Sequence, residues 1–418
     1  MAAAVDYTRY DPFAPEMQQN PFPWYAALRE SAPVWKHPSG IVFVSRHEHV
    51  SRVLADTATY SSRFASQPTP GSDPVNRQIA AIMEEGFPRV STMLTEDPPL
   101  QTRYRKTVGK ALSTRRILAL ESKMRELSDE VLDAWPARGR VDVMNTLSIP
   151  LPIRVIGHFL CMNPAVFQHV KRWSDSSVAG LGAIITDEQR IQAARDVVEL
   201  QKYWQSEFEA RVAAPGDDII SALTQAEFED ETGAERRLNM PELISIVQQL
   251  MVAGNETTTK VINETFKLLL ENYAWFERMK REPSVVAAVV EEALRLSTPN
   301  QGMFRFVTRD TELGGETIPK GGTIWLMFGS ANRDASVFPD PDAFDPERPN
   351  LKESVAFGRG AHFCIGAPLA RLELKVLFEQ VARHVESFAL PAGAKLAYEP
   401  SYILRGLAGL ELDVVKRA

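Results

Sequence analysis

A helical pattern of about 30 residues, beginning at Asn239, is the feature that most constrains the fold of this 418-residue chain. Asn239-x-x-Glu242 is typical of a capping box, and Pro241 suits a first turn that has no use for its N–H. At 1.5 Å per residue, about 30 residues span about 45 Å, so such a helix must run through the core. Its apolar positions are Leu243, Ile246, Val247, Leu250, Val261, Phe266 and Leu269.

The middle of this pattern, Ala253-Gly254-Asn255-Glu256-Thr257-Thr258, is a poor helix-forming stretch. One interpretation is a polar patch that faces solvent and tolerates a glycine. The other is a kink or groove that admits a ligand and water beside an acid and an alcohol. For Asn255 two positions stay open, because its amide either contacts solvent in the groove or faces the opposite side of the helix.

The remaining pattern predicts a mainly α fold with a minor β region. Two short β-prone runs flank a Pro-Ser-Gly turn over residues 34–44, and a second β-prone region covers residues 304–328. Helical spacing of apolar residues recurs over residues 117–135, 191–212, 283–297 and 366–384. No long Gly/Ser linker divides the chain, so a single large domain is expected over residues 1–418.

Composition excludes several classes of protein. The net charge of −7 argues against a nucleic-acid-coating protein, and only two cysteines, Cys161 and Cys364, point to a reducing compartment. No apolar run reaches about 18 residues, and the N-terminus lacks a basic region followed by an apolar run. The usual motifs of serine hydrolases, nucleotide-binding proteins and zinc peptidases are missing. We therefore expect a cytoplasmic protein with no membrane anchor and no nucleic-acid partner.

The segment Phe357-Gly358-Arg359-Gly360-Ala361-His362-Phe363-Cys364-Ile365-Gly366 places a cysteine at the start of a predicted helix. Helix-terminal N–H groups and closely approaching glycine backbone both favour a thiolate over a thiol, which is typical of a metal-ligand environment. A lone cysteine beside Phe and Ile is otherwise a small buried hydrophobic residue. The frame Gly-x-Gly-x-His-x-Cys-x-Gly favours the ligand.

This segment resembles the haem-binding loop of the cytochrome P450 family, whose pattern Phe-Gly-x-Gly-x-His-x-Cys-x-Gly it matches at every specified position. The resemblance implies the cytochrome P450 fold, with haem b (iron protoporphyrin IX) between the long central helix and the helix after the cysteine loop. It also implies that Cys364 is the ligand to the iron. The other cofactor-binding residues of the loop are then Phe357, Gly358, His362 and Gly366.

Two further segments match motifs of this family. Glu292-Ala293-Leu294-Arg295 is similar to its Glu-x-x-Arg helix motif, and the segment 344–349 resembles the one that supplies a second arginine, Arg348. The resemblance implies a buried network of Glu292, Arg295 and Arg348 behind the haem. Taken alone, Glu-x-x-Arg is an ordinary surface pair on a helix.

The central polar stretch is similar to the family's oxygen-activation segment. Gly254, Glu256 and Thr257 are then the catalytic residues, with Glu256 and Thr257 as the acid–alcohol pair that passes protons to dioxygen.

Residues 97–105 resemble the segment that contacts a haem propionate. Gln101 stands where many bacterial members carry His, so its contact is expected to be a neutral hydrogen bond, and Arg105 carries the charge. Arg305 and His362 resemble the other propionate partners, although an arginine or histidine outside this frame is often a surface residue.

The resemblance implies a monooxygenase that takes electrons from NAD(P)H through a separate ferredoxin and ferredoxin reductase. Residues 100–120 contain six basic residues and no acidic one, which supports a docking patch for an acidic carrier, and Arg359 adds to this patch. A run of like charges is otherwise usually a solvated face. The six basic residues of this run are Arg103, Arg105, Lys106, Lys110, Arg115 and Arg116.

The same resemblance points to substrate contacts in four segments, and the set suits a hydrophobic small molecule with one or two hydrogen-bonding groups. Two alternatives remain: a haem-thiolate peroxygenase or isomerase, and a haem-binding sensor. Both leave the acid–alcohol pair without an evident role. Besides Thr257, the candidates for substrate contact are Met83, Phe87, Val90, Gln249, Val252, Ala253, Gln301, Met303, Ile403 and Leu404.

Overall fold

A computed structural model describes residues 5–63, 73–181, 185–230 and 232–417 of the chain. The chain forms two compact units, each assembled from separate stretches of sequence. Unit 1 holds residues 1–61, 121–152 and 257–418, and unit 2 holds residues 62–120 and 153–256. A single domain over residues 1–418 stays a prediction.

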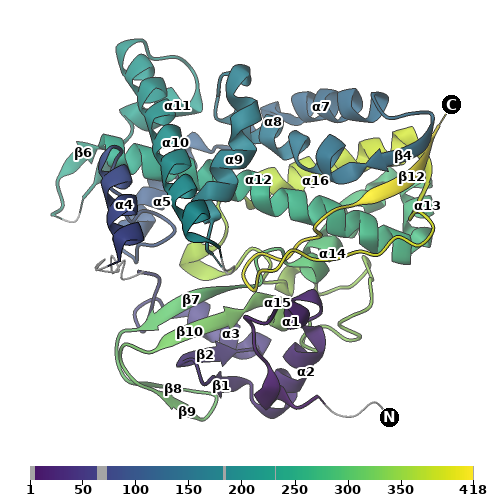
Figure 1. Cartoon of the computed structure of the whole chain (residues 1–418), viewed down its shortest axis with the longest axis horizontal. Coiled ribbons are helices and arrows are strands. Elements are labelled where there is room, and N and C mark those ends of the chain that lie inside the picture. Colours follow the sequence, from purple (N-terminus) through teal and green to yellow (C-terminus); the bar gives the residue numbers. More distant parts are fainter. Residues whose placement is uncertain (1–4, 64–72, 182–184, 231, 418) are drawn as a thin grey trace. The chain divides into compact units, whose positions relative to one another are not determined.

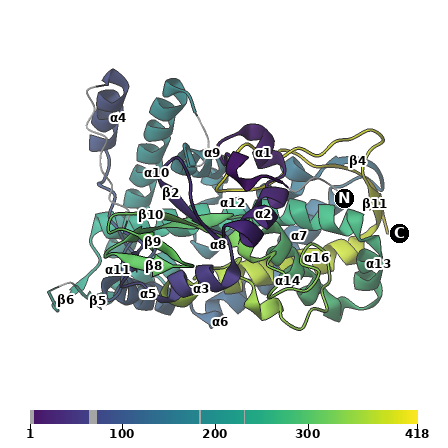
Figure 2. The ribbon, with the colours of Figure 1, turned by 90° about the horizontal axis from the view of Figure 1, so that it is seen from below.

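The long central helix is α12, Met240–Glu271, which is 32 residues long and contributes to both units. The predicted capping box begins it, because Glu242 N donates to Asn239 Oδ1 at 3.0 Å and Asn239 N donates to Glu242 Oε2 at 2.8 Å. The helix runs without interruption through Gly254, and its course can be followed in Figures 1 and 2. The prediction of this helix is confirmed.

Unit 1 contains a mixed five-stranded sheet in the order β1-β2-β10-β7-β3 (Figure 1). The predicted hairpin is confirmed as β1, Val34–Lys36, antiparallel to β2, Ile41–Val44. Parallel pairing of β10, Thr323–Met327, with β2 brings the second β-prone region beside the first. The sheet is completed by β3, Tyr60–Ser61, and β7, Gly302–Val307, while β8, Thr311–Leu313, and β9, Glu316–Ile318, pair in a separate two-stranded sheet.

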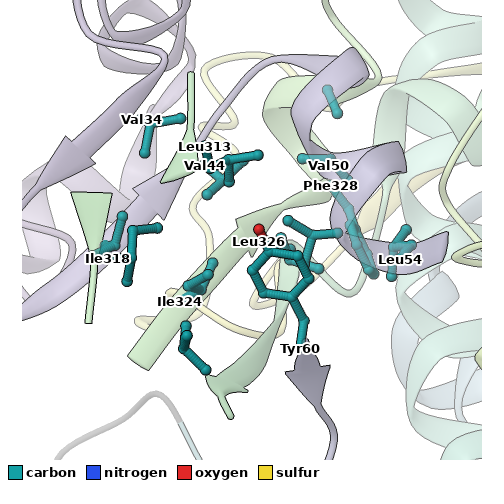
Figure 3. Close-up of a cluster of buried hydrophobic side chains, with 14 of the residues drawn as sticks. Val34, Val44, Val50, Leu54, Tyr60, Leu313, Ile318, Ile324, Leu326 and Phe328 are labelled. Carbon is teal, nitrogen blue, oxygen red and sulfur yellow. The ribbon is translucent and has the colours of Figure 1, made fainter. Parts of the chain in front are cut away.

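An apolar cluster lies on one face of this sheet. Figure 3 shows Val44, Ile324 and Leu326 of the strands gathered with Val50 and Leu54 of α3, His47–Ala55. All five side chains are at least 94% buried. Their burial removes apolar surface from water and holds α3 against the sheet. This attachment positions the Cys364 loop, because α3 also contacts the short 3₁₀ turn Gly360–His362.

A second, three-stranded sheet of unit 1 is ordered β11-β12-β4, with bounds Val385–Ala389, Glu411–Lys416 and Arg138–Asp142. It follows α16, Ala367–His384, which packs against α7, Glu121–Asp133, and α14, Val286–Ser297. The other helices of this unit are α1, Pro15–Gln19; α2, Phe22–Ser31; α13, Tyr273–Arg281; and α15, Phe328–Ala331.

Unit 2 is helical apart from the hairpin of β5, Glu227–Glu229, and β6, Glu235–Arg237. Its longest helix is α10, Asp187–Ala213, which packs against α9, Phe167–Val178, and stands beside α4, Pro74–Glu84 (Figure 2). The others are α5, Leu100–Ala111; α6, Thr114–Ala119; and α11, Ile219–Gln225; α8, Pro150–Phe159, begins in unit 1 and continues here.

The predicted fold class is confirmed, mainly α with minor sheets, and one helix expectation is wrong. Residues 117–135 do not form a single helix, because α6 ends at Ala119 and α7 begins at Glu121. Apolar spacing continues across the junction, but the Leu120 N–H closes the end of α6 on Ile117 O and Leu118 O. None of the helices in the described ranges is long and apolar enough to cross a membrane.

Candidate functional site

Cys364 ends a closed loop at the N-terminus of α16. Its N–H donates to Phe357 O at 2.8 Å, and Ala367 N donates to Cys364 O at 3.3 Å. The thiol is half-buried, so a ligand can reach it. The N-terminus of the 18-residue helix α16 follows directly, and the positive end of the helix dipole favours the thiolate.

Backbone conformation explains two glycines of this loop. Gly358 and Gly360 have φ values of +66° and +68°, which side chains of L-residues rarely adopt. A Cβ at Gly360 would also lie 2.8 Å from Leu54 O of α3. The loop therefore sits directly on α3, and this contact requires glycine at position 360.

Two arginines of the loop region have partners within unit 1. Arg371 packs over the Phe357 ring at 4.5 Å and binds Glu291 at 2.5 Å. Arg359 binds Glu353 at 2.8 Å, so this nearby carboxylate partly neutralises its charge. This pairing weakens the expectation that Arg359 adds to a docking field.

Glu292, Arg295 and Arg348 lie in one buried network. Arg295 donates to both carboxylate oxygens of Glu292 at 2.7 Å, and Arg348 Nε donates to Glu292 Oε1 at 3.0 Å. Asp345 N donates to the same oxygen at 3.0 Å. Four hydrogen bonds thus satisfy a carboxylate that has no exposed surface.

The network also holds the segment that leads to the cysteine loop. Arg295 Nη1 donates to the carbonyl oxygens of Asn332 and Pro341, both at 2.7 Å. The side chain of Asn332 then accepts from Val355 N at 2.7 Å, two residues before Phe357. Arg295 is therefore connected to the start of the loop through one buried asparagine.

Arg305 and His362 lie in unit 1 with Cys364. Arg305 is only 4% exposed on β7, where it pairs with Ile324 of β10 and donates to Phe304 O at 2.7 Å. A cation buried to this degree calls for an anionic or strongly accepting partner. His362 is half-buried at the end of the 3₁₀ turn beside the thiol.

The polar stretch of α12 is mostly buried, so the interpretation of a solvent-facing patch is wrong for its polar members. Asn255, Glu256 and Thr258 are 1%, 8% and 3% exposed. Ala253 is exposed, and Thr257 is half-buried. Small accessible residues next to a buried acid suit the alternative of a groove beside the helix.

The two polar neighbours of Gly254 and Thr257 have different environments. Glu256 Oε1 lies 3.5 Å from Lys171 Nζ of α9, which provides a cation at the acid. Asn255 donates to Ser174 Oγ and to Met251 O, both at 2.8 Å. Its amide therefore faces α9 and not solvent, which decides between the two positions left open for it.

In unit 2, helix α5 carries both residues predicted to contact a propionate. Gln101 is fully buried, and its Oε1 accepts from Thr102 Oγ1 at 3.2 Å. Arg105 is half-buried. Between them, Tyr104 donates to Glu242 Oε1 at 2.6 Å, and burial together with this carboxylate raises the pKa of the Tyr104 hydroxyl.

Glu242 connects α5 to the start of α12 and to the β5–β6 hairpin. Arg236 of β6 donates to both of its oxygens, at 2.7 and 2.8 Å. Burial alone would raise the pKa of Glu242, but the hydrogen bonds from Arg236 and Tyr104 outweigh it and leave that pKa lowered. The acid of the capping box thus also fixes the helix that carries Gln101.

The basic run of residues 100–120 divides into paired and unpaired side chains. Arg103 binds Glu229 at 2.7 Å, and Arg116 binds Asp217 at 3.0 Å. Lys106, Lys110 and Arg115 are exposed and form no ion pair with any residue that the structure describes. Only these three remain as unpaired positive charge for a partner.

The predicted substrate contacts of unit 2 lie on α4, α12 and the loop between α4 and α5. The Gln201 amide binds both backbone groups of Phe87, at 2.9 and 3.2 Å, and Val90 N donates to Ser245 Oγ. Gln249 Nε2 donates to Thr92 Oγ1 at 2.8 Å. Met83 and Val252 are half-buried, and Ala253 is exposed. The loop is thus tied to α10 and to α12, and α12 carries three other candidates.

In unit 1 the other four candidates come together. Gln301 N donates to Ile403 O at 2.7 Å, and Asn300 forms a β-bridge with Leu404. Met303 and the turn residues are half-buried, whereas the Gln301 amide is buried and donates to Thr298 O. The Gln301 amide is therefore committed to a backbone hydrogen bond, whereas the side chains of Met303, Ile403 and Leu404 stay partly accessible.

Sequence reasoning missed Lys171, Asn332 and Lys260. Each contacts a residue far away in the chain, Glu256, Val355 and Glu399 respectively. Such pairs leave no local pattern. The only signal was the polarity of positions flanked by apolar helix residues.

The residues present fit a haem with one thiolate ligand. Cys364 is accessible at a helix N-terminus, and the buried Arg305 and the half-buried His362 belong to the same unit. No cluster of three or more His, Cys, Asp or Glu side chains in the described ranges suits a bare metal ion. A single thiolate is sufficient where a porphyrin supplies the other in-plane ligands.

Comparison with known proteins extends over nearly the whole chain. Residues 184–401 match the family model described as Cytochrome P450. The 6-deoxyerythronolide B hydroxylase of Saccharopolyspora erythraea is 33% identical over 399 residues, which are 92% of this chain and 93% of the relative.

Two solved structures are similar over almost all of their length. Cytochrome P450 CYP109Q5 from Chondromyces apiculatus has a TM-score of 0.83 and 33% identity, with 100% of both chains covered. CYP109E1 from Bacillus megaterium in complex with testosterone has a TM-score of 0.80 and 31% identity, covering 94% of this chain and 99% of that one.

Proposed function

Because the chain belongs to the cytochrome P450 family of haem-containing oxidoreductases, we propose that it inserts one atom of O2 into a hydrophobic small molecule, using electrons from NAD(P)H. The observation that carries this proposal is the closed loop that presents the Cys364 thiol at the N-terminus of α16. Haem b, the family's cofactor, supplies the iron at which dioxygen is activated. All other steps are assigned to side chains of this chain.

Cys364 is the proposed ligand, and five positions support the cofactor around it. Phe357, Gly358 and Gly366 shape the loop, while His362 and Arg305 of unit 1 would hold propionate groups. Gln101 and Arg105 of α5 are the proposed propionate partners from unit 2. A neutral amide at position 101 leaves Arg105 as the charge-assisted donor of that helix.

The proposed proton path ends at Thr257. Its hydroxyl would hold a proton at the oxygen that accepts it, and the adjacent Glu256 would resupply that proton from water. The ammonium group of Lys171 lies 3.5 Å from Glu256 Oε1 and provides a positive charge beside the acid. Gly254 lets the Ile156 side chain of α8 pack closely against this helix, because a Cβ at position 254 would lie 3.0 Å from Ile156 Cδ1.

The proposed electron donor is a ferredoxin, itself reduced by a ferredoxin reductase. Lys106, Lys110 and Arg115 form an exposed positive patch that is not neutralised by described residues. An acidic carrier is attracted to such a patch, and its encounter rate depends on ionic strength. These partners and NAD(P)H are found in the cytoplasm, which is the proposed location.

The proposed substrate is apolar with one or two hydrogen-bonding groups. Most candidate contacts are aliphatic or aromatic, and Gln249 adds an amide whose Oε1 is buried without a hydrogen-bond partner in the described structure. A substrate hydroxyl or N–H would satisfy this oxygen. Difference spectra with terpenoids, steroids, aromatic acids, fatty acids and macrolides would identify the class.

Two measurements test the proposal. Reduced protein with carbon monoxide should show the red-shifted Soret band of thiolate ligation, and Cys364→His should lose it. Cys161→Ser is the matched control, because burial raises the pKa of the Cys161 thiol and disfavours its thiolate. A wild-type band typical of histidine ligation would overturn the assignment of Cys364.

Turnover then separates the three functional classes. A monooxygenase forms product with NAD(P)H, ferredoxin and ferredoxin reductase under air. Product with peroxide alone would indicate a peroxygenase, and product without either oxidant would indicate an isomerase. Haem binding with no turnover in any assay would indicate a sensor.

A further inference from the structure

Residues 397–408 form a short hairpin near the C-terminus. Tyr398 and Leu407 form a β-bridge, Glu399 N donates to Gly406 O at 3.0 Å, and Ala408 N donates to Ala397 O at 2.8 Å. The N–H groups of Ile403 and Leu404 both lie within hydrogen-bond distance of Ser401 Oγ, at 3.3 and 3.1 Å. The turn that carries two candidate substrate contacts is therefore internally braced.

One edge of the hairpin is fixed to the segment before β7. Gln301 N donates to Ile403 O at 2.7 Å, and Arg405 N donates to Pro299 O at 2.8 Å. These bonds set the register of the turn along β7. They do not determine its distance from α12, which requires a contact on another face.

Lys260 of α12 provides that contact. It follows Thr257 by three residues, so it lies about one helical turn further along α12. Its ammonium group binds Glu399 Oε2 at 2.6 Å, and its side chain is 9% exposed. The stem runs under Gly406, where a Cβ would lie 2.8 Å from Lys260 Cδ and closer still to Cγ.

A second contact lies one turn beyond Lys260. Glu264, whose carboxyl is buried, lies beside Tyr398, and burial raises the pKa of this carboxyl. Arg405 stacks over the Tyr398 ring at 3.5 Å and donates to the carbonyl oxygens of Gln18 and Gln19, at 2.6 and 3.0 Å. Arg405 thus connects the base of the hairpin to Gln18 and Gln19, while Lys260 binds Glu399 on the strand that leads to the turn.

We propose that Lys260 is a positioning residue for substrate selection: its ion pair with Glu399 and the fit of its stem under Gly406 set the distance between α12 and the Ile403–Leu404 turn. This proposal rests on the proposed function. Without the pair, the turn keeps its register on β7 but loses its anchor to the helix that carries Thr257. Ligands large enough to reach the turn should then bind differently, whereas small ones should not.

Two azoles of different size test this size dependence. In Lys260→Met, which keeps most of the stem, we expect the Kd of clotrimazole to change by about tenfold and that of imidazole by less than about twofold. Lys260→Arg should restore much of the wild-type clotrimazole affinity. Lys267→Met is the matched control, because Lys267 forms a partly exposed pair with Glu271 on the same helix.

Hydrogen exchange provides a readout that needs no haem. The amides of residues 397–408 should exchange faster in Lys260→Met than in wild type or Lys267→Met. Gly406→Ala should also speed exchange, and this effect should shrink in the Lys260→Ala background, where no stem is left to displace. Unchanged exchange in both single variants would overturn the proposal.

The outcomes separate this proposal from the assignment of the function. A wild-type protein without the thiolate band would overturn the proposed function, yet the exchange experiment would still report on the hairpin anchor. If Lys260→Met retains the thiolate band and shifts both azoles equally, the residue affects the cofactor pocket as a whole, and size-dependent positioning is refuted.

Discussion

The guanidinium of Arg295 and the carboxylate of Glu292 form two hydrogen bonds of 2.7 Å where neither side chain has any exposed surface. Arg348 approaches the same carboxylate at 3.0 Å. Removing the acid would leave two buried guanidinium groups without a counter-charge. A buried pair broken on one side costs about 3–5 kcal/mol of stability.

Glu292→Gln should therefore lower the free energy of unfolding by about 3–5 kcal/mol, measured by urea titration. Glu291→Gln is the control, since the adjacent residue forms a partly exposed pair with Arg371 and should cost at most about 1 kcal/mol. Equal costs for the two variants would show that burial adds nothing to the Glu292 network.

The unpaired basic residues of α5 and α6 should govern electron transfer. Lys110→Glu with Arg115→Glu is expected to slow reduction by an acidic ferredoxin by about tenfold at low salt, because the docking field is reversed. The rates of variant and wild type should converge at about 0.5 M salt, where screening removes the field. Substrate-induced spectral shifts should not change.

Lys202→Glu is the control for this pair, because it makes one of the same charge reversals at an exposed side chain of α10. Its reduction rate should stay near the wild-type rate. A Lys110 and Arg115 variant that is reduced as fast as wild type at low salt would remove the docking assignment.

The buried carboxyl of Glu373 on α16 should make stability depend on pH. Burial raises the pKa of Glu373 to about 8, and its Oε1 has no hydrogen-bond partner in the described structure. A raised folded-state pKa means that the folded protein retains the proton longer than the unfolded chain. The contribution of the protonated Glu373 carboxyl to stability is therefore fully present below about pH 4.5 and is lost as the pH rises through about 8.

Glu373→Gln cannot ionise, so its stability relative to wild type should increase between pH 5 and pH 8, by up to about 3–5 kcal/mol. Urea titrations at pH 5, 6, 7 and 8 would measure the trend. Glu379→Gln is the control on the same helix, because its carboxylate binds Arg125 and Lys375 and its loss should destabilise instead. A flat difference for Glu373→Gln across this range would contradict the raised pKa.

Local patterns predicted the elements of the site, but not the contacts between distant segments. Asn239 and Glu242 predicted the start of α12, and Gly358 and Gly360 predicted a loop with close backbone contacts, which the structure places on α3. The break at Leu120 was missed, since apolar spacing continues through it. A change of direction between two helices depends on the elements that each helix packs against. The spacing of apolar residues along the chain carries no information about these elements.

The pairing of charged side chains likewise depends on contacts between distant segments. Six basic residues between Leu100 and Leu120 predicted one patch, yet Arg103 and Arg116 are bound to Glu229 and Asp217, each more than 100 residues away. Likewise Lys260 is paired with Glu399, 139 residues away, which no local pattern predicted. The sequence lists the available charges, while the tertiary fold decides which of them remain unpaired.

The coupling of electron flow to product should depend on Thr257. Thr257→Ala removes the hydroxyl proposed to hold the proton, so reduced dioxygen should leave as hydrogen peroxide before it reacts with substrate. NAD(P)H oxidation should continue, while product formed per NAD(P)H falls by about tenfold. Glu256→Gln should instead slow NAD(P)H oxidation and product formation together, because proton resupply limits both.

Product, NAD(P)H and hydrogen peroxide are measured in the same reaction, and Thr259→Ala serves as the control. Thr259 is two residues along the same helix, but its hydroxyl donates to Ser148 O at 2.8 Å and is committed to the fold. Its loss should leave the ratio of product to NAD(P)H near the wild-type value. If Thr257→Ala keeps that ratio as well, the hydroxyl is dispensable, and bound water or a hydroxyl of the substrate must supply the proton path.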